Sequence, residues 1–234
     1  MLASRSKSGF RLTLWTVLLL TLIGGSLAPL AQPAADPFAK WEPEIRAFEQ
    51  ADKTNPPPAG VILFVGSSSI RFWSTLAQDF PGKPVLNRGF GGSQMSDCVH
   101  FIPRIVTPYR PRQIFLYEGD NDLASGKAPA QVFADYQSFV RDTRAALPDV
   151  PILFLSIKPS PSRWKFVEQA KEANRMIESF AKTQRNLSFI DMFTPLLGTD
   201  GQPLPDIYRA DKLHLNAKGY AIWRGIVAPY LDAR

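Results

Sequence analysis

Cysteine and histidine are scarce in this 234-residue chain. Cys98 is the single cysteine, which excludes an intrachain disulfide and a cysteine-based zinc site. There are two histidines, so a catalytic base built on imidazole has only two candidates. His100 lies in an apolar helical stretch and is expected to be a partly buried structural residue. His214 precedes the last predicted helix and is the better candidate for a base.

Clusters of one charge are also missing. The formal net charge is +6, but three of the 27 basic residues, Arg5, Lys7 and Arg11, precede Asp36, and no acidic residue does. The rest of the chain therefore carries 24 basic against 21 acidic residues, in scattered positions. Nucleic-acid binding normally needs a concentrated basic surface, so no nucleic-acid partner is expected.

Several nucleotide and hydrolase signatures are missing as well. The chain has neither the G-x-x-x-x-G-K-[ST] motif of a phosphate-binding loop nor the G-x-S-x-G turn of an ordinary α/β-hydrolase. Residues 89–94 nearly match a dinucleotide-binding fingerprint, but Gln94 stands where its third small residue belongs. Asp120 and Asp122 could suggest a cation site, but without further clustered oxygen ligands a solvated turn is the expected arrangement.

One long apolar run is present, and it lies at the N-terminus. Residues 12–31 are nearly uncharged and rich in leucine, follow the three basic residues, and lead into a Pro/Ala-rich segment. This order is typical of an export signal. Ser26-Leu27-Ala28 fits a cleavage site, although Pro29 follows it. Retention as an N-terminal anchor is the alternative, because the run is near the lower length limit for crossing a bilayer.

Two parts of the chain follow from this reading. Residues 1–35 are expected to form a signal peptide or anchor with a linker, and residues 36–234 a single domain, since 45% hydrophobic content suffices for one good core. The protein is then exported, either periplasmic or secreted, and meets a membrane only if the N-terminal segment is retained.

The domain alternates short apolar runs with amphipathic helical patterns. The runs are typical of buried strands and cover residues 61–65, 84–87, 113–117, 152–156 and 187–190. Helical patterns cover residues 38–51, with the regular helix starting near Glu42 because of Pro43, and then residues 132–143, 166–180 and 217–230. The alternation predicts an α/β fold with a mainly parallel sheet and helices on both faces.

In such a sheet the loops that follow the strands share one rim. These loops are residues 66–69, 88–93, 118–123 and 158–164. The first of them carries three hydroxyls, Ser67, Ser68 and Ser69, directly after a buried strand. That position exposes small nucleophilic side chains at a sheet edge, although most serine-rich turns are only turns.

Partners for a nucleophilic serine are present elsewhere. Asp211 lies three residues before His214, where it can turn back to accept a hydrogen bond from the imidazole Nδ1 and leave Nε2 as the base. A helix cap beside a surface histidine is the alternative. Glycine backbone in residues 89–92 and the side-chain amide of Asn121 are candidate donors to an oxyanion, and plain turns are the alternative for both.

Residues 65–69, 87–92, 119–122 and 211–214, in this order, together resemble the four sequence blocks of the SGNH hydrolase superfamily, also called GDSL-type esterases and lipases. The resemblance implies a three-layer, flavodoxin-like fold. By position, Ser68 resembles the nucleophile, His214 the base and Asp211 its orienting residue. The backbone N–H groups of Ser68 and Gly92 and the side chain of Asn121 resemble the oxyanion donors. Ser67 replaces the aspartate of the first block, so Ser67 and Ser69 stay open as alternatives to Ser68.

The resemblance implies a serine esterase that needs no metal or organic cofactor. Its expected substrates are small-molecule carboxylic esters, with short acyl or acetyl groups on carbohydrate or lipid preferred because of the export signal and the lack of an extended apolar lid. A non-catalytic carbohydrate- or lipid-binding module on the same scaffold is the alternative. The basic and aromatic side chains of residues 158–164, which are Lys158, Arg163 and Trp164, could contact a substrate, although a rigid proline loop accounts equally well for this segment. Tyr208 and Arg209 could also line the site.

Overall fold

The computed structural model describes residues 3, 9 and 36–231. The predicted export signal lies outside the described residues. By contacts, the chain divides into two units, residues 1–35 and residues 36–234, and the fold below is that of the second. None of the described helices combines the length and apolar character that a bilayer-spanning helix needs.

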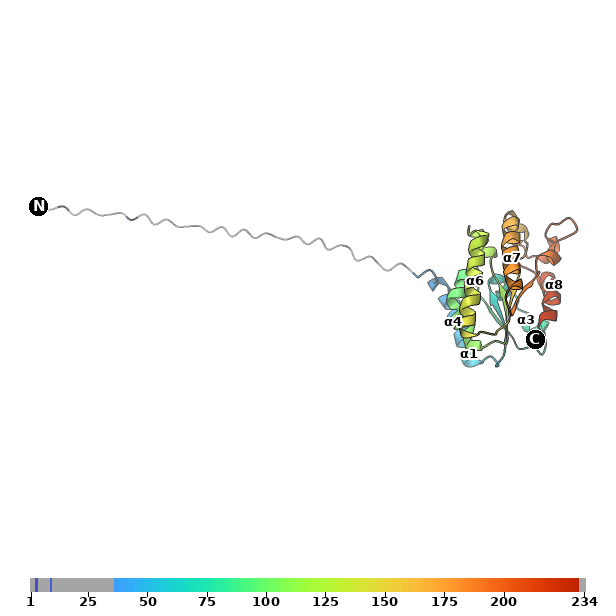
Figure 1. Ribbon diagram of the computed structural model, residues 1–234, viewed down its shortest axis with the longest axis horizontal. Coiled ribbons are helices and arrows are strands. Elements are labelled where there is room, and N and C mark those ends of the chain that lie inside the picture. The colour runs from blue at the N-terminus through green and yellow to red at the C-terminus, as the bar shows by residue number, and fades with distance from the viewer. Residues whose placement is uncertain (1–2, 4–8, 10–35, 232–234) are drawn as a thin grey trace. The chain divides into compact units, whose positions relative to one another are not determined.

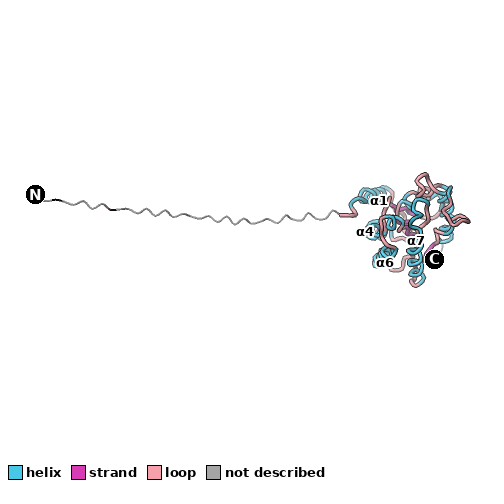
Figure 2. The backbone as a smooth tube through the Cα atoms, turned by 90° about the horizontal axis from the view of Figure 1, so that it is seen from above, coloured by secondary structure: helices cyan, strands magenta, loops and turns pink. Residues whose placement is uncertain are grey.

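Five parallel strands form a single sheet at the centre of the domain (Figures 1 and 2). They are β1 (Ile62–Gly66), β2 (Val85–Gly89), β3 (Gln113–Tyr117), β4 (Ile152–Leu155) and β5 (Leu187–Ile190). Their order in the sheet is β2-β1-β3-β4-β5. β1, β3 and β4 are buried along their whole length, which explains their uninterrupted apolar sequences. The predicted α/β fold with a mainly parallel, flavodoxin-like sheet is confirmed.

Helices cover both faces of the sheet. One face carries α1 (Glu42–Thr54), α4 (Met95–Ile105), α6 (Pro129–Ala146) and α7 (Val167–Lys182). The other carries α2 (Ser68–Arg71), α3 (Leu76–Asp79) and α8 (Ala217–Val227). Figure 1 shows α4 and α6 on one side of the strands and α8 on the other. The short helix α5 (Asp120–Ala124) follows β3. Single 3-10 turns are η1 (Ala39–Trp41), η2 (Thr107–Tyr109), η3 (Pro161–Phe166), η4 (Thr194–Leu196), η5 (Pro205–Ile207) and η6 (Ala228–Tyr230).

Each face of the sheet has its own apolar core. Alternate residues of a strand point to opposite faces, so Leu63 and Val65 pack in one core and Ile62 and Phe64 in the other. In the second core Phe64 stacks on Phe115 of the neighbouring strand, with ring centroids 4.6 Å apart. Each such side chain stabilises the fold by roughly 1.5–3 kcal/mol through removal of apolar surface from water.

The strand order creates a topological switch point between β1 and β3. The chain leaves β1 over the face that carries α2 and α3, and it reaches β3 from the face that carries α4. Loops therefore diverge at the carboxyl ends of these two strands, where a parallel sheet opens a crevice for ligands. Ser68 follows β1 and Asn121 follows β3, so both lie at this crevice.

Two predictions about single residues are wrong. His100 is exposed, not partly buried, and its ring stacks on that of Phe38 at a centroid distance of 3.8 Å. Asp122 is completely buried and pairs with Lys127 at 2.9 Å, so it does not belong to a solvated turn. Asp122 accepts hydrogen bonds from the N–H of Met95, the first residue of α4, and from Lys127 Nζ, which enclose it. The contact with Met95 joins residues 27 positions apart, so the local sequence does not indicate it.

Candidate active site

Ser68 stands at the first position of α2, directly after the end of β1. The turn between them requires Gly66, which has φ +145° and lies so close to β3 that a Cβ would meet the Tyr117 carbonyl oxygen at 2.0 Å. Of the three serines, Ser67 and Ser69 are buried, whereas Ser68 is partly exposed. The turn therefore presents one hydroxyl of the three to solvent.

His214 meets Ser68 from a position 146 residues further along the chain. Its Nε2 lies 2.9 Å from Ser68 Oγ, which is hydrogen-bond distance. The loop that carries it is closed by hydrogen bonds from the Arg209 N–H to the His214 carbonyl (2.7 Å) and from the Asn216 N–H to the Ile207 carbonyl (2.9 Å). The edge of the imidazole also rests against the face of Phe72, with centroids 4.8 Å apart. These contacts hold the ring toward the serine.

Asp211 orients the imidazole. Its Oδ2 lies 2.7 Å from His214 Nδ1, and its Oδ1 accepts hydrogen bonds from the backbone N–H groups of Leu213 and His214, each at 2.9 Å. Partial desolvation raises the pKa of Asp211, but the hydrogen bonds from the His214 side chain and from the two N–H groups outweigh it and lower the pKa to about 2. The alternative of a helix cap is wrong, because Asn216 caps α8 through Lys218 and Gly219.

The loops that carry Gly92 and Asn121 are joined to each other. Gly92 adopts φ +75°, a conformation that favours glycine. The amide of Asn121 donates a hydrogen bond to the carbonyl of Ser93, the residue after Gly92, at 2.9 Å. Within residues 36–231, no acceptor lies in hydrogen-bond range of the Gly92 N–H. The N–H of Ser68, at the start of a helix, likewise has no partner in its own helix.

The register of the sheet brings these N–H groups and Ser68 to the same edge. Gly66 of β1 pairs with Gly89 of β2 on one side and with Tyr117 of β3 on the other. The chain continues from these three paired positions to Ser68, Gly92 and Asn121 within two to four residues. One end of the sheet thus carries a hydroxyl, an imidazole whose Nδ1 faces a carboxylate, and three N–H donors. These are the groups that acyl transfer requires.

The loop of residues 158–164 differs from the prediction in one respect. Lys158 is buried, so it is not a surface group that contacts a ligand. Its Nζ donates to the Leu213 carbonyl at 3.0 Å and lies 3.4 Å from Asp120 Oδ2. Burial lowers the pKa of Lys158, and the charge of Asp120 opposes this. Arg163 and Trp164 are partly exposed and line a small cavity with Asp120.

Further hydrogen bonds connect the same loop to the segment before His214. The Tyr208 hydroxyl donates to the Pro159 carbonyl at 2.8 Å, so Tyr208 is buried and does not line an open site. The Ser162 N–H donates to the Lys212 carbonyl at 3.1 Å. This function of the loop was not predicted from the sequence. The sequence feature that pointed to these contacts was a lysine shortly after a buried strand.

No group of three or more His, Cys, Asp or Glu side chains arranged to hold a metal ion occurs in the described part of the chain. Cys98 is buried and free there. Burial, the largest cause, raises the pKa of the Cys98 thiol well above its ordinary value, so this thiol is not an activated nucleophile.

Known structures share this fold. A protein from Streptococcus pneumonia that carries the provisional name platelet activating factor is similar with a TM-score of 0.72 and 22% identity, over 82% of this chain and 93% of its own. A GDSL-like lipase from Bacteroides thetaiotaomicron has a TM-score of 0.68 and 17% identity, over 80% and 97%. A family 3 carbohydrate esterase from Talaromyces cellulolyticus has 0.57 and 18%, over 73% and 96%. At these identities the likeness concerns the fold.

No curated protein sequence matches the chain. The family model of GDSL-like lipases and acylhydrolases, by contrast, matches residues 59–222. This match covers most of the domain and includes the segments of Ser68, Gly92, Asn121 and His214. The chain therefore belongs to the GDSL-like lipase/acylhydrolase family.

Proposed function

We propose that this protein is a serine esterase that hydrolyses short-chain carboxylic esters, with Ser68 as nucleophile, His214 as base and Asp211 as the residue that orients the base. The observation that carries the proposal is the chain of contacts from Ser68 Oγ to His214 Nε2 (2.9 Å) and from His214 Nδ1 to Asp211 Oδ2 (2.7 Å). Membership of an acylhydrolase family supports ester or thioester hydrolysis as the reaction class.

The mechanism follows from these side chains. A serine hydroxyl is a weak nucleophile at neutral pH, so His214 accepts its proton as Ser68 Oγ attacks the ester carbonyl. Asp211 stays ionised and stabilises the imidazolium that forms. His214 then gives the proton to the leaving alkoxide, which departs as the alcohol. Water attacks the acyl-enzyme in the same way, and the acid product and free Ser68 are regenerated.

The developing oxyanion receives the N–H groups of Ser68, Gly92 and Asn121. Each such donor contributes roughly a hundred- to a thousandfold to kcat in an enzyme of this kind, because it is already oriented before charge develops. Asn121 keeps its orientation through the bond to the Ser93 carbonyl, which leaves its second amide hydrogen for the substrate.

Short acyl esters suit the surroundings of the triad. An open hollow of about 490 Å³ adjoins Phe72, whose ring contacts His214, and its lining combines apolar side chains with polar and charged ones, among them Thr75, Arg209 and Arg224. Arg209 lies over the Phe72 ring at 4.6 Å from its centroid. The polar and charged groups of this hollow can form hydrogen bonds with the alcohol part of an acetylated carbohydrate. The carbohydrate esterase among the similar structures agrees with this choice.

Export is part of the proposal. The basic and apolar N-terminal segment, residues 1–35, would direct the protein out of the cytoplasm, so that its ester substrate is an extracytoplasmic one. Fractionation of cells that express the full chain tests this, and cytoplasmic recovery of an unprocessed chain would contradict it.

Hydrolysis of p-nitrophenyl acetate, butyrate and octanoate by the full chain tests the catalytic proposal. Ser68→Ala and His214→Ala are expected to lower kcat by at least about a thousandfold. Ser67→Ala and Ser69→Ala serve as matched controls, because both remove a buried hydroxyl from the same turn, and they are expected to stay within about tenfold of the wild type. Equal rates for the wild type and Ser68→Ala would favour a non-catalytic carbohydrate- or lipid-binding module.

A further inference from the structure

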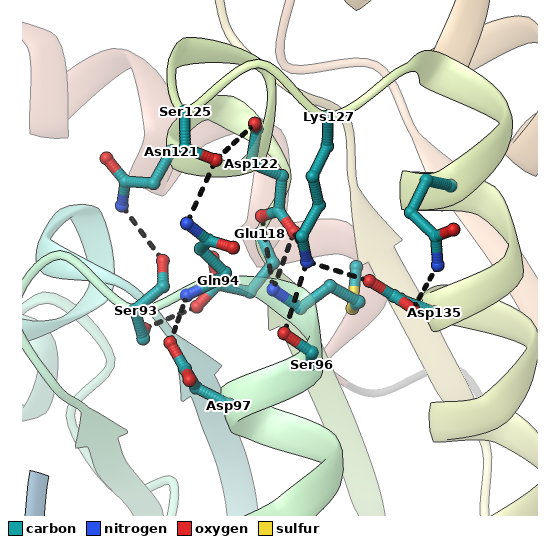
Figure 3. Close-up of polar contacts among 12 residues, drawn as sticks. Ser93, Gln94, Ser96, Asp97, Glu118, Asn121, Asp122, Ser125, Lys127 and Asp135 are labelled. Atoms are coloured by element: carbon teal, nitrogen blue, oxygen red, sulfur yellow. Dashed lines mark hydrogen bonds and ion pairs between the residues drawn. The ribbon is translucent and has the colours of Figure 1, made fainter. Parts of the chain in front are cut away.

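Glu118 is a completely buried carboxyl group at the end of β3, next to the proposed oxyanion hole but outside the triad (Figure 3). Its Oε1 lies 2.5 Å from Ser93 Oγ and 3.4 Å from Cys98 Sγ. Its Oε2 is buried and has no hydrogen-bond partner among the described residues. No cation of that part of the chain forms an ion pair with it either. An isolated carboxylate in such surroundings would be very costly.

The number of hydrogens available for the hydrogen bonds of Ser93 indicates how the free-energy cost of a buried charge is avoided. Ser93 Oγ has two oxygen neighbours, Glu118 Oε1 at 2.5 Å and the Phe90 carbonyl at 3.0 Å. A hydroxyl has one hydrogen and cannot donate fully to both. A protonated Glu118 solves the conflict, because its O–H donates to Ser93 Oγ while the Ser93 O–H donates to the carbonyl of Phe90. The short Glu118–Ser93 distance fits an O–H donor.

The charges around Glu118 act in the same direction. Asp122 and Asp120 on α5 and Cys98 on α4 are the ionisable groups that act on it. Lys127 is paired with Asp122 and Asp135 rather than with Glu118. Burial, and then the charge of Asp122, raise the pKa of Glu118 well above its ordinary value. This direction agrees with the protonated carboxyl group that the hydrogen bonds at Ser93 indicate.

Ser93 connects this acid to two of the oxyanion donors. It follows Gly92 directly, so its position fixes the direction of the backbone that carries the Gly92 N–H. Its carbonyl accepts the hydrogen bond from Asn121 at 2.9 Å, as Figure 3 also shows. The Ser93 hydroxyl is in turn clamped between Glu118 and the Phe90 carbonyl. The loop of residues 90–93 is thus held by the side chain of Glu118, the residue that follows β3.

We propose that Glu118 is a positioning residue of the oxyanion hole: as a neutral carboxylic acid it donates a hydrogen bond to Ser93 Oγ and so fixes the Gly92 N–H and, through the Ser93 carbonyl, the Asn121 amide. Glu118 does not contact the substrate. Its effect rests on the proposed esterase function and belongs to the acylation and deacylation transition states, in which negative charge develops on the substrate oxygen.

Two substitutions at position 118 separate hydrogen bonding from charge. Glu118→Gln keeps the shape of the neutral acid and an N–H donor toward Ser93, so kcat with p-nitrophenyl acetate is expected within about threefold of the wild type. Glu118→Met keeps the volume but removes the donor. Its kcat is expected to fall by about 10- to 100-fold, which is less than the loss caused by removal of a whole oxyanion donor, and its KM is expected to change by less than about threefold. A merely structural Glu118 predicts that Gln and Met are equally harmful.

Gln113→Met is the matched control for loss of stability. Gln113 is a buried polar residue at the opposite end of the same strand, and its amide donates to the Tyr230 carbonyl at 2.7 Å. This variant is expected to lose thermal stability to a similar degree without loss of kcat. A fall of kcat in Gln113→Met equal to that in Glu118→Met would overturn the proposal.

Two further measurements do not depend on esterase activity. The infrared difference spectrum between the wild type and Glu118→Gln at pH 7 should contain the C=O stretch of a protonated carboxyl group, and a carboxylate band instead would contradict a neutral Glu118. Amide hydrogen exchange in the peptide of residues 90–95 should be faster in Glu118→Met than in the wild type and Glu118→Gln. Equal exchange rates in the wild type and both variants would show that Glu118 does not position this loop.

The same set distinguishes a failure of this inference from a failure of the proposed function. If the full-chain wild type hydrolyses p-nitrophenyl acetate no faster than Ser68→Ala, the proposed esterase function is refuted. The infrared band and the exchange rates would then still decide whether Glu118 is neutral and positions the loop. Full activity in Glu118→Met, with Ser68→Ala inactive, would refute the positioning function alone.

Discussion

Asp211 accepts three hydrogen bonds within one turn of chain, and all of them favour its charged form. Its pKa of about 2, which partial desolvation opposes and the hydrogen bonds from His214 and Leu213 produce, keeps the carboxylate ionised throughout the pH range of an esterase assay. Because its pKa is lower in the folded protein, the ionised Asp211 stabilises the fold at pH values above its ordinary pKa of 3.8. This contribution to the free energy of unfolding is lost as the pH falls toward 2. The side chain is 46% exposed, so the contribution is small.

Asp211→Asn tests the orienting function. An amide can present either its oxygen or its NH₂ group to His214 Nδ1, so the tautomer with Nε2 as base is no longer enforced, and kcat is expected to fall by about 10²- to 10⁴-fold. The check is kcat for p-nitrophenyl acetate at pH 7 to 8. Asp206→Asn is the control, because Asp206 is an exposed aspartate near the same loop that pairs with Lys218. Equal activity in both variants would exclude Asp211 from the triad.

The residues that could be predicted from the sequence are those whose signal is local or scarce. Ser68 follows an unmistakable buried strand, and His214 is one of two histidines with an aspartate three positions before it. Glu118 and Lys158 also follow strands, but their partners Ser93 and Leu213 lie 25 and 55 residues away. Burial of such polar groups depends on tertiary packing, so the sequence alone did not indicate it.

At the scale of elements, the turn after β1 depends on the backbone of Gly66. A Cβ there would lie 2.0 Å from the Tyr117 carbonyl oxygen and 2.9 Å from its carbon, both of which are backbone atoms of β3 that cannot rotate away. Gly66→Ala must therefore separate β1 from β3, and we expect a loss of at least about 3 kcal/mol in the free energy of unfolding, measured in urea.

Gly225→Ala is the control for this substitution. Gly225 lies inside α8 and has no positive φ, and a Cβ at this position would meet no atom within 4 Å outside its own helix backbone. Alanine is the better helix former by up to about 1 kcal/mol, so this variant is expected to be neutral or slightly more stable. A similar loss in both variants would mean that the close approach of β1 and β3 is not what requires glycine at position 66.

Two neighbouring elements of the site are joined by the buried pair of Lys158 and Asp120. Lys158 Nζ reaches the Leu213 carbonyl next to His214 (3.0 Å), and Asp120 is the first residue of α5, next to Asn121. Lys158→Met is expected to lower the free energy of unfolding by about 3–5 kcal/mol, because it leaves a nearly buried aspartate unpaired. Urea unfolding and kcat of the same samples provide the check.

The double variant Lys158→Met/Asp120→Asn identifies the cause. Removal of the orphaned charge should restore part of the stability that Lys158→Met loses, with a coupling energy above about 0.5 kcal/mol. It should not restore kcat, because the hydrogen bond to the Leu213 carbonyl is still missing. Strict additivity of the two substitutions would show that the pair is not energetically coupled.

At the scale of the whole molecule, Glu118 affects how stability depends on pH. Its raised pKa means that the folded protein retains a proton that the unfolded chain releases above the ordinary value of 4.5. The contribution to stability is thus fully present below that pH and falls as pH rises, by about 1.4 kcal/mol per pH unit until the folded-state pKa is reached.

Glu118→Gln removes this dependence. The difference in unfolding free energy between Glu118→Gln and the wild type should therefore grow with pH by about 1.4 kcal/mol per unit above roughly pH 5. Urea unfolding at a series of pH values measures it. A difference that is constant between pH 5 and pH 8 would mean that Glu118 titrates alike in the folded and unfolded states.

The overall fold could be predicted because each strand and helix carries its own pattern. The boundaries of β3 and β5 coincide with the predicted runs, and α1 begins at Glu42 as Pro43 indicates. α1 continues to Thr54, three residues beyond the expected end, because Pro56 is the first residue that prevents a further turn. The long-range hydrogen bonds of Glu118 with Ser93 and of Asp122 with Met95, which form the buried polar cluster, have no comparable local pattern.

The central claim is that Ser68, activated by His214, is the single nucleophile of this domain. Labelling of the full chain with a fluorophosphonate, followed by peptide mass spectrometry, tests it most directly. The account predicts one phosphonyl group, on Ser68, absent in Ser68→Ala and formed at least about a hundredfold more slowly in His214→Ala. A label on Ser67, on Ser69 or outside this turn, or undiminished labelling of His214→Ala, would contradict it.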